Sequence, residues 1–158
     1  MSNTNYDGRT LDLCILGALP YSAQTTAEVD STLDIARGGQ ICAGVVKLMQ
    51  KVMILLLTYS QRYDPFWGTD VPEALLSGNL NKAATRLGQT LPTAMSEVVA
   101  SLKAQEYLEM PLDERIDRLE QVDEMTVDYL TGSISIKIRV TTLLGAQIEL
   151  VVPIRKLV

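Results

Sequence analysis

The spacing of hydrophobic residues predicts an amphipathic helix over residues 40–59. Hydrophobic side chains recur there every three or four positions, which is the period of one helix face. Lys47, Gln50 and Lys51 fall on the opposite face, where we expect solvent. The last turn, residues 53–57, has no polar side. We therefore expect this end to be buried, and the protein's own core is favoured over a partner.

Two more helical segments are expected before the chain changes period. Thr69 or Asp70 can cap a short helix with Pro72 in its first turn. A longer helical region follows over residues 80–108, and Pro92 is expected to interrupt it. The hydrophobic spacing in its second half, which includes Leu108, is typical of a helix that lies across a sheet.

The C-terminal third alternates strictly between hydrophobic and polar residues. Residues 133–140 alternate, a turn follows around Gly145, and residues 147–154 alternate again. A period of two is that of a half-buried strand, so this region predicts a β-hairpin. Residues 116–130 can supply one more strand. Helices followed by antiparallel strands predict an α+β fold, in which an N-terminal arm and helices pack on a small sheet.

The length of 158 residues is typical of one domain. We divide the chain into an N-terminal arm, residues 1–39, and a domain, residues 40–158. No run of hydrophobic residues is long enough to cross a bilayer, and no signal segment is recognised, so no membrane association is expected. Cys14 and Cys42 lie far apart in sequence and are interpreted as reduced, buried thiols.

Composition restricts the chemistry that the chain can perform. The formal net charge is -5, which disfavours nucleic acid as a partner. Histidine is absent, which removes the usual general base and the commonest metal ligand. Without a motif for a nucleophile, a phosphate loop or a metal cluster, we expect no metal, no cofactor and no enzymatic activity.

Acidic residues between positions 113 and 124 are the one arrangement that allows hydrolysis. Two carboxylates can serve as acid and base, and Asp113 with Glu114 would be the pair. Arg115 and Arg118 lie among them, however. This mixture favours an exposed, ion-paired surface over a catalytic site.

The segment LLLTYSQRYDPFWGTDVP, residues 55–72, gathers aromatic residues that are scarce elsewhere in the chain. Bases could stack on such a group, but the acidity of the chain makes this less favoured. Tyr, Trp and Arg often anchor protein interfaces, so Arg62, Tyr63 and Trp67 are candidates for docking a partner. The alternative is that Phe66 and Trp67 only cover the end of the preceding helix.

The order of these features resembles a phage baseplate family formerly labelled tail lysozyme. The motifs are LLT at residues 56–58, SQR at 60–62 and PFWG at 65–68. DERIDRLEQV, residues 113–122, stands where the family carries a Glu-Pro-Arg signature before a C-terminal hairpin. Here Glu114 and Arg115 are adjacent, without the proline. The resemblance covers residues 39–154 and extends to components of type VI secretion baseplates.

The resemblance implies a structural role in a contractile tail. Its members are wedge components and sheath initiators, present in six copies around the tail axis. The implied partners are baseplate wedge proteins and the tail sheath protein, with tube or hub proteins as further candidates. The implied location is the virion, in the tail baseplate, after assembly in the host cytoplasm. The hairpin would supply a strand from which the first sheath ring is built.

We therefore predict a baseplate protein that joins the wedge to the sheath by strand donation. A small muralytic hydrolase that uses Asp113 or Glu114 is the alternative function. The residues assigned to partner binding are the following: Arg62, Tyr63, Trp67, Glu114, Arg115, Ile148, Leu150, Val152 and Ile154.

Overall fold

The order of elements follows the change in hydrophobic period along the chain. The computed structural model describes residues 12–13, 41–60, 67–76 and 78–155. The helices in these residues are α1 (Gly44–Leu57), α2 (Val71–Leu75) and α3 (Leu80–Ala104). The strands are β1 (Asp12–Leu13), β2 (Ile41–Cys42), β3 (Ile116–Gln121), β4 (Thr126–Asp128), β5 (Ser133–Thr142) and β6 (Gln147–Arg155). The α+β prediction is confirmed.

β5 is the centre of a four-stranded antiparallel sheet. β3 and β4 both pair with one side of β5, and β6 pairs with the other side over nearly its whole length. The predicted hairpin is confirmed, with Ile138 opposite Leu150 in its middle. Residues 116–130 form two strands instead of the single strand expected. A second, two-stranded sheet pairs β1 with β2, and the remaining residues of the proposed arm lie outside the described ranges.

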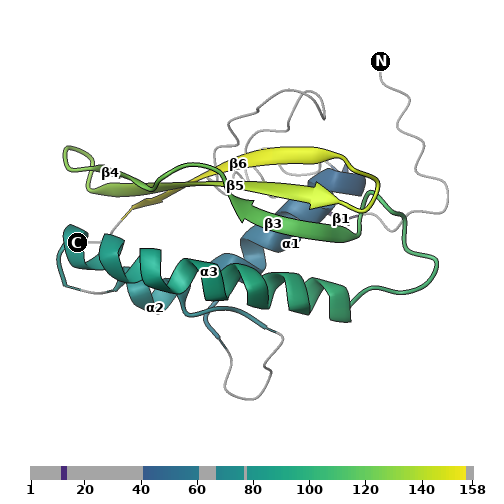
Figure 1. Ribbon diagram of the computed structural model, residues 1–158, viewed down its shortest axis with the longest axis horizontal. Coiled ribbons are helices and arrows are strands. Elements are labelled where there is room, and N and C mark those ends of the chain that lie inside the picture. The colour runs from purple at the N-terminus through teal and green to yellow at the C-terminus, as the bar shows by residue number, and fades with distance from the viewer. Residues whose placement is uncertain (1–11, 14–40, 61–66, 77, 156–158) are drawn as a thin grey trace.

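The core lies between the inner face of this sheet and the helices, with α3 crossing below the strands in Figure 1. From the hairpin it takes the inward residues of each strand: Ile134, Ile136, Ile138, Val140, Ile148, Leu150 and Val152. From α1 and α3 it takes residues such as Val52, Leu56, Leu87 and Leu91. The alternation read from the sequence therefore identifies the buried side of the hairpin correctly.

α1 is buried on more sides than its sequence predicts. Lys47 and Gln50 were expected to face solvent, but both are buried, and Lys51 is half-buried. The expectation is therefore wrong for Lys47 and Gln50. A carboxylate from a distant segment pairs with Lys47 inside the protein, which removes the need for solvent around the ammonium group.

α3 is one continuous helix, so the interruption predicted at Pro92 is wrong. Pro92 and Gly88 both lie on the exposed side of α3, where water can reach the carbonyl that the proline leaves unbonded. Asn79 caps the start of α3, since its side chain accepts a hydrogen bond from the Lys82 amide at 3.0 Å. Leu108 lies beyond the end of the helix and is exposed. No helix in the described part of the chain is long and hydrophobic enough to cross a membrane.

Candidate partner-binding surfaces

The aromatic segment between α1 and α2 is a loop closed at its base by backbone hydrogen bonds. The Ser60 amide donates to the Thr69 carbonyl at 2.9 Å, and the Thr69 amide donates to the Thr58 carbonyl at 2.8 Å. The buried Thr69 hydroxyl also donates to the Leu56 carbonyl at 2.7 Å. These bonds fix the two sides of the loop to the end of α1.

Gly68 allows the two sides of this loop to approach each other. Its φ angle is +83°, and a Cβ at this position would lie 2.1 Å from the Tyr59 carbonyl oxygen. Only glycine fits such a position, because a side chain there would overlap the facing backbone. The close approach holds Tyr59 and Trp67 on neighbouring sides of the base.

Trp67 and Tyr59 are both on the surface at the base of the loop. Trp67 is 37% exposed, and Tyr59 is more exposed still. Trp67 is therefore only partly buried against the end of α1, and the exposed part of its side chain can contact a partner. Arg62, Tyr63 and Phe66 lie outside the described residues.

Glu114 is buried and joins the start of α1 to the segment before β3. Only 2% of the residue is exposed, so the prediction of a solvated acidic surface is wrong for this carboxylate. Its Oε1 accepts from the Gly44 amide at 3.0 Å, and its Oε2 lies 3.4 Å from Lys47 Nζ. Ala43, at the N-cap position, has no side chain that could cap α1. Glu114 supplies that cap from 70 positions away.

Arg115 joins two further segments at the same end of the molecule. Its Nε donates to Glu106 Oε2 at 3.0 Å, and its carbonyl accepts from the Leu143 amide at 3.0 Å. The Arg115 side chain is 28% exposed, so a partner can still reach it. Glu114 and Arg115 together connect α1, the segment after α3 and the turn between β5 and β6.

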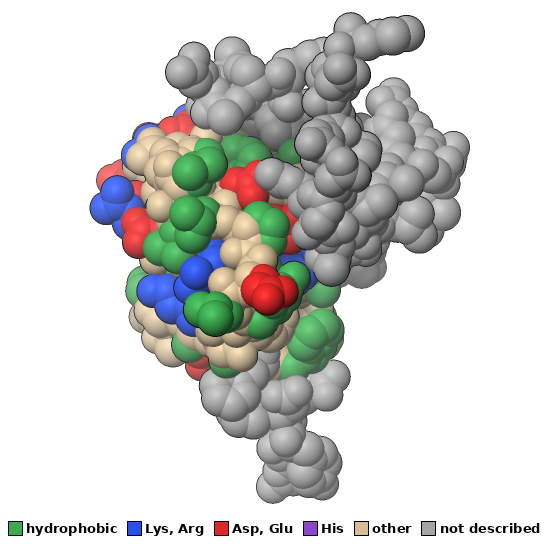
Figure 2. Space-filling view, turned by 90° about the vertical axis from the view of Figure 1, so that its right-hand side faces the viewer, with side chains coloured by type: hydrophobic (Ala, Val, Ile, Leu, Met, Phe, Trp, Pro, Cys, Tyr) green, Lys and Arg blue, Asp and Glu red, His purple; other side chains and the backbone are tan. Residues whose placement is uncertain are grey.

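Exposed hydrophobic side chains occur in and next to the two segments that Arg115 joins, and the sequence prediction missed them. We call this surface the hairpin end; its residues are Tyr107, Leu108, Leu112, Leu143 and Leu144, with Arg115 among them. Figure 2 faces this end and shows hydrophobic side chains beside charged ones. The signal was available in TTLLGAQ, where two leucines occupy a turn that usually carries polar residues.

β6 is an edge strand within the described sheet. Its one partner among the described residues is β5, and none of these residues pairs with the other side of β6. Ile148, Leu150 and Val152 are buried side chains of the core, so they can contribute to a partner contact only by holding β6 in place. Ile154 pairs with Ile134 through the backbone.

The hydrogen-bond pattern identifies which residues of β6 face outward. The Thr142 amide donates to the Ala146 carbonyl, and alternation from that pair places residues 148, 150, 152 and 154 in bonds with β5. The backbone groups of residues 147, 149, 151 and 153 then point away from β5. Residue 153 is a proline, which has no N–H, and proline is tolerated at such a position on an edge.

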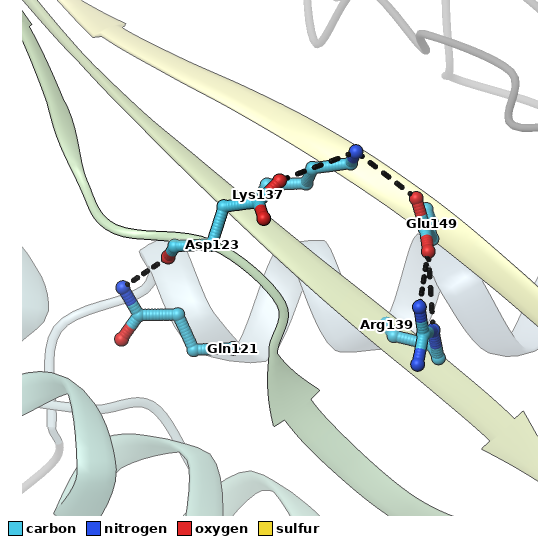
Figure 3. Close-up of polar contacts among 5 residues, drawn as sticks. All are labelled: Gln121, Asp123, Lys137, Arg139 and Glu149. Atoms are coloured by element: carbon cyan, nitrogen blue, oxygen red, sulfur yellow. Dashed lines mark hydrogen bonds and ion pairs between the residues drawn. The ribbon is translucent and has the colours of Figure 1, made fainter.

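The outer face of the sheet carries an ion-paired network (Figure 3). Glu149 on β6 lies 3.2 Å from Lys137 Nζ and accepts from the Arg139 guanidinium, both on β5. Lys137 also lies 3.4 Å from Asp123. The hydrogen bond from Arg139, and then that from Lys137, lowers the pKa of Glu149 below its ordinary value. The network ties β5, β6 and the loop after β3 together.

The pair required for hydrolysis does not come together as an open acid and base. Both oxygens of Glu114 are occupied inside the protein, and Asp113 is half-buried next to it. Among the described residues there is no group of three or more potential ligands that could hold a metal ion.

Comparison with known proteins identifies no relative. No family model matches the chain, and neither a curated protein nor a solved structure matches it. The resemblance to the baseplate family therefore rests on the sequence motifs alone.

Proposed function

We propose that this chain is a non-catalytic baseplate wedge component that joins the baseplate to a contractile sheath. The observation that carries the proposal is the outer edge of β6, with which no described residue pairs. The resemblance associates this strand with the sheath. The proposal includes six copies around the tail axis and a location in the virion. Wedge proteins and the sheath protein are the partners it requires.

Strand addition to β6 is the mechanism by which the first sheath ring would be built. An exposed edge offers backbone donors and acceptors to a further strand, which supplies affinity without a preformed pocket. β6 is already paired with β5 over residues 147–155. A sheath strand would therefore add to the outer edge of β6 while β6 stays in its own sheet. The buried side chains of β6 keep that edge in a fixed register.

The hairpin end and the base of the aromatic loop are the proposed contacts with wedge proteins. Arginine and aromatic residues in partly buried settings contribute much of the energy of many interfaces. Arg115 is held by Glu106 yet remains partly exposed, and exposed leucines occur in the segments that it joins. Trp67 provides a second anchor at a separate place in the fold. The pairing of Glu114 with Lys47 favours this structural role over the alternative of a muralytic hydrolase.

The test is to block the outer edge of β6 without changing its pairing with β5. Val151→Pro removes an outward N–H, and Val151→Ala is the matched control that keeps it. Particles that carry Val151→Pro are expected to contain baseplates and tubes without polymerised sheath. Particles with Val151→Ala are expected to assemble normally. Electron microscopy of tail particles gives the readout, and thermal unfolding of each purified variant verifies its fold.

Normal sheath on particles with folded Val151→Pro protein would contradict strand addition to β6. The hydrolase alternative has its own assay, a zymogram of the purified chain on peptidoglycan. Clearing that disappears in Glu114→Gln, in a variant that remains folded, would overturn the structural proposal.

A further inference from the structure

A groove lies between α3 and β3, on the side of the sheet away from β6. Its volume is about 350 Å³, and Figure 1 shows α3 passing beneath β3. One face of α3 and the first half of β3 line it with the following residues: Pro92, Met95, Ser96, Val99, Asp117, Arg118 and Leu119. Met95 and Val99 pack against the core but are only half-buried, so the groove leaves hydrophobic side chains partly open to solvent.

The outer side of β3 borders this groove. β5 pairs with one side of β3, and no described residue pairs with the other side. The Val122 amide donates to the Lys137 carbonyl at 3.0 Å, and alternation from that pair turns every second residue of β3 towards β5. The backbone groups of Leu119 and Gln121 then point away from β5.

A β-bulge limits how far another strand could pair along this edge. The register between β3 and β5 shifts between Ile116 and Arg118, so Asp117 has no residue directly opposite it on β5. A neighbouring strand can pair regularly with residues 119–121 but not across the bulge. The edge therefore fits a short extended segment better than a long strand.

A residue that pairs with Leu119 would place its side chain over the groove. Residues directly opposite each other in a ladder have their side chains on the same face of the sheet, and Leu119 belongs to the core on the helix side. There the added side chain would meet Met95 and Val99, which lie one turn apart on α3. The geometry requires a hydrophobic residue at this position of the segment.

The positions next to it meet an excess of carboxylates. Asp117 and Glu120 share one guanidinium, that of Arg118, at 3.7 and 3.8 Å. Arg139 lies opposite Glu120 on β5 but forms its ion pair with Glu149. One arginine does not neutralise two carboxylates, so a lysine or arginine of a neighbouring strand would be attracted to this edge.

We propose that the outer edge of β3 and this groove bind a short, basic, extended segment of a partner protein. The segment would add a strand beside β3, with a hydrophobic side chain over Met95 and Val99 and basic side chains near Asp117 and Glu120. Backbone hydrogen bonds would supply affinity, while the groove and its acidic rim would select the sequence. The acidic rim disfavours nucleic acid as the occupant.

The probe is a short fluorescent peptide in which lysine and valine alternate, and its binding to the full chain is followed by anisotropy. Gln121→Pro removes an outward amide and is expected to weaken binding about fivefold. Gln121→Ala is the matched control, which keeps that amide and should bind as the wild type does. Circular dichroism verifies that each variant is folded.

Two further substitutions separate the groove from the rim. Met95→Gln is expected to weaken binding about fivefold, because it places an amide beneath the hydrophobic side chain, whereas Met95→Leu should retain binding. Glu120→Lys is expected to weaken binding about threefold, because it replaces attraction by repulsion. Glu109→Lys, a reversal at an exposed carboxylate outside β3, should leave binding unchanged.

Four outcomes would overturn the proposal. The first is no binding of the basic peptide at low ionic strength. The second is equal binding of a peptide in which glutamate and valine alternate. The third is a loss of binding in Val151→Pro, which would place the peptide on β6. The fourth is a dimer of the chain that Gln121→Pro dissociates, which would make a second copy the occupant. The assay uses no tail component, so its result does not depend on the proposed baseplate role.

Discussion

Glu114 and the residue that follows it hold several separate parts of the described fold together. The Glu114 carboxylate caps α1 and pairs with Lys47, while the next residue bonds to Glu106 and to the turn after β5. A buried carboxylate in this position is stable only because both of its oxygens have donors. The residue that the resemblance aligns with a binding signature thus also has a structural role inside the protein.

Replacement of Glu114 by alanine is expected to destabilise the protein by about 3 kcal/mol, because it leaves the Lys47 charge without this carboxylate and the Gly44 amide without an acceptor. Denaturant unfolding followed by circular dichroism measures the change. Glu120→Ala is the control, since among the described residues the ion pair of Glu120 is a long, half-exposed one with Arg118. Equal effects of the two substitutions would contradict the assigned role of Glu114.

Gly68 is expected to tolerate no side chain. Gly68→Ala should cost about 3 kcal/mol or more, since a positive φ is combined with a Cβ that would overlap the Tyr59 carbonyl. Gly145→Ala is the matched control: its φ is also positive, at +87°, but nothing lies within 4 Å of the added Cβ. Gly145→Ala should cost only about 1 kcal/mol. Thermal unfolding compares the stabilities of the two variants. Equal losses of stability would mean that the close approach of Gly68 to Tyr59 does not add to the cost of a side chain.

At the scale of elements, the β5–β6 hairpin is expected to lose stability in acid. The pKa of Glu149 is lowered by Arg139 and Lys137, and the pKa of Asp128 is lowered first by the Thr131 side chain. A carboxyl group that releases its proton more readily in the folded state stabilises the fold above its ordinary pKa. Glu149 loses this stabilising contribution as the pH falls from its ordinary pKa, 4.5, through the lower pKa that it has in the folded protein.

The expected result is a melting temperature that falls as the pH drops below about 4.5, with a smaller fall in Glu149→Gln. Glu97 acts in the opposite direction, since burial and the nearby Asp70 raise its pKa and favour its protonated form in the folded protein. Glu109→Gln, an exposed carboxyl outside the network, is the control. Identical pH profiles for wild type and Glu149→Gln would contradict the contribution of the network.

The sequence predicts helices and strands best where one hydrophobic period continues long enough to define a buried face. Both runs of the hairpin are found as predicted, and the strand near Asp128 ends one residue before the expected Tyr129. The prediction failed at Pro92, because whether a proline ends a helix depends on which side of the helix faces water. It also failed at Lys47, because the partner that makes its burial favourable lies far away in sequence.

At the scale of the whole molecule, sequence patterns predict least well which residues meet on a surface. The resemblance drew attention to Arg115, and the structure shows that it bonds to two other segments, each of which has exposed leucines nearby in sequence. Tyr129, in the turn between β4 and β5, likewise donates to Asn81 on α3, which lies 48 positions away. Convergence of this kind has no periodic signature in the sequence, so the sites could be anticipated only as isolated residues.

Pro153 has a consequence for how large any assembly built on β6 can become. An added strand finds outward amides at residues 147, 149 and 151 but none at residue 153. Its pairing therefore weakens towards the end of β6, which limits the length of the joint. A short joint admits a specific, brief strand and disfavours the long, unspecific pairing that leads to fibres. In the strand addition proposed above, the proline would thus favour one short neighbouring strand over a growing fibre.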